Sequence, residues 1–171
     1  MNIYVLLKRT FDTEEKITLS NGKINEDGAE FIINPYDEYA VEEAIVVRDA
    51  HGGEVTVVSV GSEEAEKQLR TALAMGADKA VLINIEDDVE DGDQYTTSKV
   101  IAEYLKDKEA DLIIAGNVAI DSGSGQVGPR VAEILEIPYI TTITKLEING
   151  ETATVVRDVE GDSEVIEASL P

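Results

Sequence analysis

Short apolar runs alternate with amphipathic segments along most of the chain. The runs are rich in β-branched residues and apolar at successive positions, as strands buried on both faces of a parallel sheet are. They lie at residues 3–7, 55–60, 80–83 and 112–115. Helical patterns follow at about 36–50, 62–75, 95–108 and 126–136. This alternation predicts an α/β fold, with an open, mostly parallel sheet and helices on both faces.

Turn and cap residues set the limits of these helices. Gly52 and Gly53 are expected to end the first helix and Gly76 the second, because glycine is favoured just beyond a helix C-terminus. Ser62 is a candidate N-cap. Asn34 can cap the first helix, with Pro35 at its first position.

Two stretches depart from this alternation and predict antiparallel hairpins. Asn21-Gly22 lies between the strand-like segments 16–19 and 23–33. Asn149-Gly150 similarly separates 145–148 from 152–157, and 164–170 is expected to add another strand. We therefore expect the parallel sheet to carry added antiparallel hairpins.

Composition narrows the class of protein. A chain of 171 residues suits one domain, and a formal charge of −22 argues against nucleic-acid or anionic-membrane partners. No apolar stretch approaches the roughly 20 residues of a membrane span, so no membrane insertion is expected. The absence of cysteine excludes disulfides and fits a cytoplasmic location. Because a strand-like segment stops at Pro171, we expect the sequence to be part of a longer chain.

Two candidate reactive features are weak. The acidic run 86–93 resembles a calcium loop, but Val89 and Ser98 stand where a ligand and the bidentate glutamate belong, so we expect no metal. His51 is better explained as a cation at the end of a helix than as a catalytic base.

The glycine-rich stretch "AIDSGSGQVGPR", residues 119–130, is the strongest candidate site. It follows a buried strand and precedes a helix, at the sheet edge where open α/β folds bind ligands. Glycines and a helix N-terminus can together hold an anion. The stretch has no P-loop lysine, and its G-x-G-x-x-G spelling lacks the acidic partner of a dinucleotide fingerprint. A phosphate-binding loop and a tight strand–helix turn both remain open.

Taken together, several stretches resemble the beta (small) subunit of electron transfer flavoprotein. The matching segments span essentially the whole chain: "VLLKR" at 5–9, "NPYDEYAVEEA" at 34–44, "RTALAMGADKA" at 70–80, "AIDSGSGQVGP" at 119–129 and "VVRDVEGDSEVIEASLP" at 155–171. Members of that family continue beyond the last segment into a C-terminal arm, which the resemblance implies is absent from residues 1–171.

The resemblance implies an adenine-nucleotide-hydrolase-like fold in one nucleotide-binding domain, a structural AMP and no catalytic residues. It also implies a larger alpha subunit that carries most of a shared FAD site. Such a heterodimer takes electrons from acyl-CoA-type dehydrogenases and passes them to a quinone oxidoreductase. Some members bind a second FAD in place of AMP, and the sequence leaves that alternative open.

The family's nucleotide-binding positions can be transferred to this chain. The adenine side involves Leu6, the turn 34–37 and Val60, while residues 121–131 meet the ribose and phosphate. The transferred residues are Leu6, Asn34, Pro35, Tyr36, Asp37, Val60, Asp121, Ser122, Gly123, Ser124, Gly125, Gln126, Val127, Gly128, Pro129, Arg130 and Val131. The backbone N–H groups of 123–128 are expected to matter most. Because Arg130 is the only cation expected near this loop, we expect a preference for AMP over ATP.

Two other classes of function share this kind of fold. A stand-alone stress-type ATP-binding domain would leave the segment 155–171 unexplained. An ATP pyrophosphatase needs an S-G-G-x-D-S-like loop after the first strand, and residues 8–12, "KRTFD", stand there instead. The electron-transfer subunit is therefore the favoured interpretation.

Overall fold

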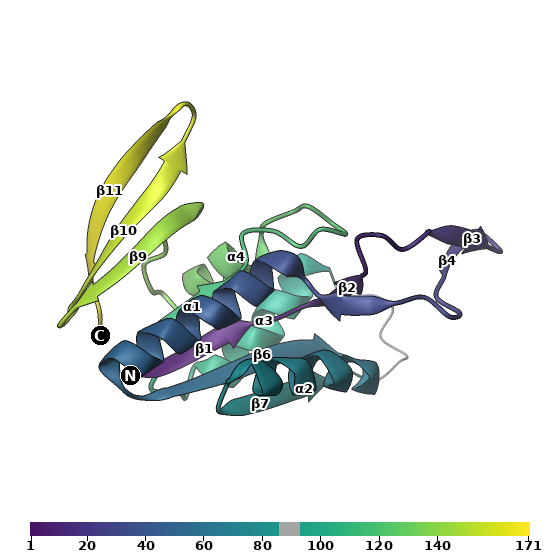
Figure 1. Ribbon diagram of the computed structural model, residues 1–171, viewed down its shortest axis with the longest axis horizontal. Coiled ribbons are helices and arrows are strands. Elements are labelled where there is room, and N and C mark those ends of the chain that lie inside the picture. The colour runs from purple at the N-terminus through teal and green to yellow at the C-terminus, as the bar shows by residue number, and fades with distance from the viewer. Residues whose placement is uncertain (86–92) are drawn as a thin grey trace.

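The computed structural model describes residues 1–85 and 93–171, and its centre is a parallel sheet (Figure 1). The sheet has the order β7-β6-β1-β8. Its strands are β1 (Asn2–Leu6), β6 (Glu54–Gly61), β7 (Lys79–Asn84) and β8 (Leu112–Ala115). The chain builds outward from β1 to β7 and then returns to place β8 on the other side of β1. The strand order therefore reverses between β1 and β8, and a crevice is expected at their carboxyl ends.

Helices cover both faces of this sheet, which confirms the predicted fold class. One face packs against α1 (Pro35–His51) and α2 (Glu66–Met75), the other against α3 (Gln94–Leu105) and α4 (Val127–Ile134). Because successive side chains of a strand point to opposite faces, Val57 packs on the first side and Val58 on the second. Both are fully buried, which explains why the strands are apolar at successive positions.

The glycines end their helices as predicted, whereas Ser62 does not act as a cap. Gly52 follows α1 with φ 75° and Gly76 follows α2 with φ 125°, in the left-handed region that favours glycine. Ser62 precedes a 3₁₀ turn, η1 (Glu63–Ala65), and its side chain makes no capping hydrogen bond. The predicted helix 62–75 is thus a 3₁₀ turn followed by α2.

The Asn21-Gly22 turn joins β3 (Thr18–Ser20) to β4 (Lys23–Asn25) as predicted. The predicted strand 23–33 is interrupted, because Gly28 turns the chain with φ 75°. The chain resumes as β5 (Phe31–Ile33), which pairs with β2 (Arg9–Phe11), a strand not predicted from the sequence. These short strands carry the chain away from the carboxyl end of β1, and the β3–β4 hairpin projects at their tip (Figure 1).

The last part of the chain forms an antiparallel sheet in the order β11-β10-β9. Its strands are β9 (Ile143–Asn149), β10 (Thr152–Val159) and β11 (Asp162–Ser169), and they confirm the second predicted hairpin and the added strand. Ile148 and Ala153 are buried in the same core as Val41 and Val47 of α1. This sheet lies at the opposite end of the molecule from the β3–β4 hairpin (Figure 1).

No helix in the described ranges has both the length and the apolar character that crossing a membrane requires.

We expect Val57→Ala to lower the free energy of unfolding by about 2 kcal/mol, because it removes two buried methyl groups from the central sheet. Val165→Ala is the matched control, since that side chain is 69% exposed on β11. It should change the free energy of unfolding by less than about 0.5 kcal/mol. Urea denaturation of the two variants measures the difference, and equal effects would contradict the described core.

Candidate functional site

A cleft of about 1590 Å³ lies at the carboxyl ends of the parallel strands. Its walls come from the ends of β1, β6 and β8, the segment 115–128, the first turn of α3, and β2. The cleft is larger than the roughly 300–1,000 Å³ of an ordinary small-molecule site. It lies where the strand order reverses, which is the position that the topology favours for a ligand.

The side chain of Asn34 holds the loop after β8. Its Nδ2 donates to the carbonyl of Val118 at 2.9 Å, and its Oδ1 accepts from the N–H of Ile120 at 3.1 Å. Asn34 is 1% exposed, and it stands at the N-cap position of α1 without capping that helix. Capping propensity identified the position, but the side chain serves a loop more than 80 residues away in sequence.

Asp37, in the first turn of α1, joins the ends of β1 and β8. Its Oδ2 accepts from the backbone N–H of Lys8 at 2.8 Å, and its Oδ1 accepts from the N–H of Gly116 at 3.2 Å. A Cβ at Gly116 would overlap Asp37 Oδ1 and the backbone of Tyr36, so this position requires glycine. Burial raises the pKa of Asp37 to about 6, although hydrogen bonds from Lys8, Asn34 and Gly116 act in the opposite direction.

The glycine-rich loop presents backbone donors at the start of α4. Gly123 (φ 64°) and Gly125 (φ 59°) let the chain turn there. The N–H of Gly123 donates to the carbonyl of Ala119 at 2.8 Å and is therefore engaged. Within residues 1–85 and 93–171, the N–H groups of Ser124, Gly125 and Gln126 have no hydrogen-bond acceptor. Donors in this position at a helix N-terminus are suited to an anion.

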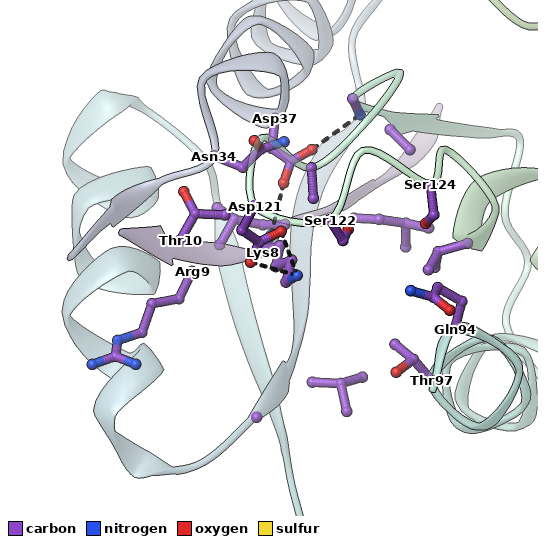
Figure 2. Close-up of a pocket in the computed structure, with 18 of the residues that line it drawn as sticks. Lys8, Arg9, Thr10, Asn34, Asp37, Gln94, Thr97, Asp121, Ser122 and Ser124 are labelled. Carbon is purple, nitrogen blue, oxygen red and sulfur yellow. Dashed lines mark hydrogen bonds and ion pairs between the residues drawn. The ribbon is translucent and has the colours of Figure 1, made fainter. Parts of the chain in front are cut away.

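The opposite wall of the cleft includes the first turn of α3. Asp93 caps this helix by accepting from the N–H of Thr96 at 2.7 Å. Gln94 and Thr97 then line the cleft, across from Lys8 and Arg9 (Figure 2). Sequence reasoning did not find this wall. The available signal was topological, because the helix after β7 must also begin near the carboxyl edge of the sheet.

Lys8 and Arg9 place two cations in the cleft, which corrects the expectation that Arg130 is the only one nearby. The Lys8 ammonium lies 2.7 and 2.8 Å from the carboxylate oxygens of Asp121. Arg9 pairs with Glu64 at 2.7 Å, and its guanidinium lies 3.3 Å from the centre of the Phe31 ring. The sequence contained the signal, since Lys8 and Arg9 directly follow the first buried strand.

Arg130 lies outside the lining of this cleft. Its guanidinium donates to Gln126 Oε1 at 2.9 and 3.1 Å from an exposed position on α4. Arg130 thus contacts Gln126, the residue just before α4, without itself lining the cleft. The preference for AMP over ATP therefore needs a different physical basis from the one that the sequence suggested.

The structure brings most of the other candidate residues together. Those that line the cleft are Leu6, Asn34, Asp37, Val60, Asp121, Ser122, Ser124, Gly125, Gln126, Val127 and Gly128. Those outside its lining are Pro35, Tyr36, Gly123, Pro129, Arg130 and Val131. Val131 is 1% exposed and packs in the core between α4 and the sheet.

The remaining sequence candidates lie elsewhere. His51 is the last residue of α1. It lies near the amino ends of the parallel strands, whereas the cleft lies at their carboxyl ends. Residues 86–92 of the acidic run lie outside the part of the chain that the structure describes. In the described part of the chain, His, Asp and Glu side chains form no group of three or more that could hold a metal ion.

We expect Asp37→Asn to weaken the pH dependence of stability between about pH 4 and 7. The folded pKa of about 6 lies above the ordinary 3.8, so the folded state binds the extra proton. The resulting stabilisation is complete below pH 3.8 and is lost as the pH rises through 6. Two pKa units correspond to about 3 kcal/mol.

The measurement is urea denaturation at pH 4 and pH 7 for both proteins. All other carboxyl groups are common to the pair, so the difference between the two slopes isolates Asp37. Identical pH dependence in the variant would contradict this assignment of the Asp37 pKa.

Comparison with known proteins shows the family of this chain. A family model described as electron transfer flavoprotein domain matches residues 21–171. The electron transfer flavoprotein subunit beta of Bacillus subtilis (strain 168) is 68% identical over 171 residues, which cover 100% of this chain and 66% of the relative. The protein of the same name from Syntrophomonas wolfei subsp. wolfei is 45% identical, covering 100% of this chain and 67% of the relative.

A third relative is the caffeyl-CoA reductase-Etf complex subunit CarD of Acetobacterium woodii. It is 39% identical over 175 residues, covering 100% of this chain and 66% of the relative. The chain thus spans about two thirds of the length of these relatives. Full coverage of this chain at high identity, together with the matched family model, establishes its kinship. The chain belongs to the electron transfer flavoprotein family, among its beta subunits.

Proposed function

We propose that this chain binds AMP in the cleft as one nucleotide-binding domain of an electron transfer flavoprotein. In this proposal it acts in the cytoplasm as a structural partner of an alpha subunit that holds most of the FAD site. The assembled protein carries electrons from acyl-CoA-type dehydrogenases to a quinone oxidoreductase. The beta chain contributes binding surfaces and no catalytic residue.

The observation that carries the proposal is the set of unengaged N–H groups at 124–126, which lie at the start of α4 and beside the cleft. Three adjacent backbone donors at a helix N-terminus match the oxygens of one phosphate group. The start of α4 lies beside the end of β8, since a Cβ at Gly128 would be in ordinary contact with the Ala115 Cβ, at 3.7 Å. A phosphate would be held by these donors, at the loop end of the cleft.

The remainder of the cleft fits the base and sugar of a nucleotide. Its apolar lining comes from the sheet and from the helices α3 and α4: Leu6, Val60, Ile101 and Val127. Asn34 and Asp37 already use their polar atoms to bind the ends of β1 and β8. We therefore propose that these two side chains position the backbone of the site and do not contact the nucleotide themselves.

A second FAD in place of AMP is the alternative that one observation favours. The cleft volume of about 1590 Å³ exceeds what a mononucleotide fills. The stacked side chains of Arg9, Phe31 and Phe11 lie in its wall, with the two rings 4.5 Å apart between centres. A flat ring system could stack near such a wall. Nothing described above favours a stand-alone ATP-binding domain of the stress type.

We expect Gly125→Ala to weaken AMP binding by about tenfold, through displacement of the backbone donors. A Cβ at Gly125 would lie 3.1 Å from the Asn117 carbonyl oxygen and 3.2 Å from Val118 Cγ1, so the loop must shift. Gly123→Ala is the matched control, because it has a similar φ of 64° but no atom within 4 Å of its added Cβ. Titration calorimetry with AMP measures both, and equal loss of affinity would count against the loop as the phosphate site.

We expect the purified chain by itself to bind FAD weakly and to acquire a stoichiometric flavin only when it is produced with an alpha subunit. The physical reason is that the proposal assigns most of the flavin contacts to the other chain. Absorbance of the flavin relative to protein concentration measures this. A stoichiometric yellow flavin on the chain alone would favour the alternative with a second FAD.

A further inference from the structure

An exchangeable ion pair in the cleft joins Lys8 to Asp121 (Figure 2). We infer that Lys8 supplies the cation for the nucleotide phosphate and that Asp121, which competes for the same ammonium, restricts the cleft to one phosphate group. This inference rests on the proposed nucleotide function and names the residues that determine its selectivity.

The backbone of Lys8 is held on both sides. Its N–H donates to Asp37 at 2.8 Å, and its carbonyl accepts from the N–H of Asn34 at 2.9 Å. The side chain extends from this anchored base to Asp121, which belongs to the same loop as the donors at 124–126. The ion pair therefore holds the ammonium against the loop that carries those donors.

The Lys8 ammonium can change partners at small cost. The Lys8 side chain is 49% exposed and that of Asp121 is 31% exposed. An ion pair with this exposure is weakened by solvent, and its loss costs little. An incoming phosphate carries a larger negative charge than a carboxylate and offers several acceptor oxygens, so it can replace Asp121 on the ammonium.

The other nearby guanidinium groups have their own contacts. Arg9 is 21% exposed, packs on the Phe31 ring and pairs with Glu64. Arg130 lies outside the cleft lining, and its guanidinium already donates to Gln126. Of the described residues that line the cleft, Lys8 is therefore the cation available to an anion at the loop.

The rest of the lining opposes additional negative charge. Its carboxyl groups belong to Glu26, Asp37, Glu63, Glu64, Asp93 and Asp121, and its cations are Lys8 and Arg9. One phosphate can use Lys8 and the backbone donors together. A second or third phosphate finds no further cation and meets carboxylates, including the Asp121 carboxylate that the first phosphate has displaced.

The experiment is titration calorimetry of adenosine, AMP and ATP without magnesium. The variants are Lys8→Gln, Lys8→Arg and Asp121→Asn. The matched controls are Lys145→Gln and Glu147→Gln, which remove the partners of an exposed ion pair of 2.6 Å on β9, outside the cleft lining. These controls make the same changes in net charge. Thermal unfolding of each variant confirms that it is folded before titration.

We expect the wild-type protein to bind AMP more tightly than ATP. Lys8→Gln should weaken AMP binding by about tenfold and change adenosine binding by less than about twofold, since it removes one charge-assisted contact to phosphate. Lys8→Arg should keep most of the wild-type affinity for AMP, because it keeps the positive charge. Asp121→Asn should tighten AMP binding by about threefold or more and ATP binding by a larger factor. Both β9 controls should stay within about twofold of wild type.

Each contrary result has a distinct meaning. If Lys8→Gln binds AMP as the Lys145→Gln control does, Lys8 is not the phosphate cation and the inference is wrong while the proposed function stands. If Asp121→Asn affects AMP and ATP equally, or weakens both, the competition by Asp121 is wrong. If the wild-type protein binds neither adenosine nor AMP, the proposed function fails and the inference fails with it.

Discussion

The pair of buried polar side chains at the start of α1 determines the geometry of the cleft. Asn34 binds the loop after β8, and Asp37 binds the backbone of both Lys8 and Gly116. These buried contacts, together with the exposed Lys8–Asp121 ion pair, join the ends of β1 and β8 beyond their last paired residues, Leu6 and Ala115. The placement of the glycine loop, the Lys8 ammonium and the start of α4 all follow from this connection.

Burying a carboxyl group for this purpose has an energetic cost. The raised pKa of Asp37 shows that desolvation outweighs the hydrogen bonds it accepts. The two N–H groups meet different oxygens of Asp37, and in an amide one of those oxygens would be replaced by an NH2 group, which is a donor. The carboxylate offers an acceptor oxygen to each N–H group and therefore fixes two strand ends at once.

The sequence pattern predicted the features that depend on neighbouring residues, namely the buried strands and the ends of the helices. Apolar runs located the strands, and glycines such as Gly52 and Gly76 located the helix ends, because burial on both faces and positive φ leave direct marks on residue type. The pairing of β2 with β5 left no such mark, since strands this short depend on tertiary contacts. The loop at 121–128 was found from its glycines, whereas Gln94 and Thr97 were missed because ordinary polar residues of a first helical turn carry no distinguishing pattern.

The excess of carboxyl groups along the cleft also affects how quickly a ligand can arrive. A negatively charged wall on a chain of net charge −22 repels an approaching anion over distances comparable to the screening length, about 10 Å at 0.1 M salt. Added salt shortens that range and so should increase the encounter rate of an anionic ligand. A protein with a basic cleft shows the reverse dependence, because salt weakens the attraction that steers its ligand inward. The cleft of this chain would therefore collect anions faster in a saline medium than in a dilute one.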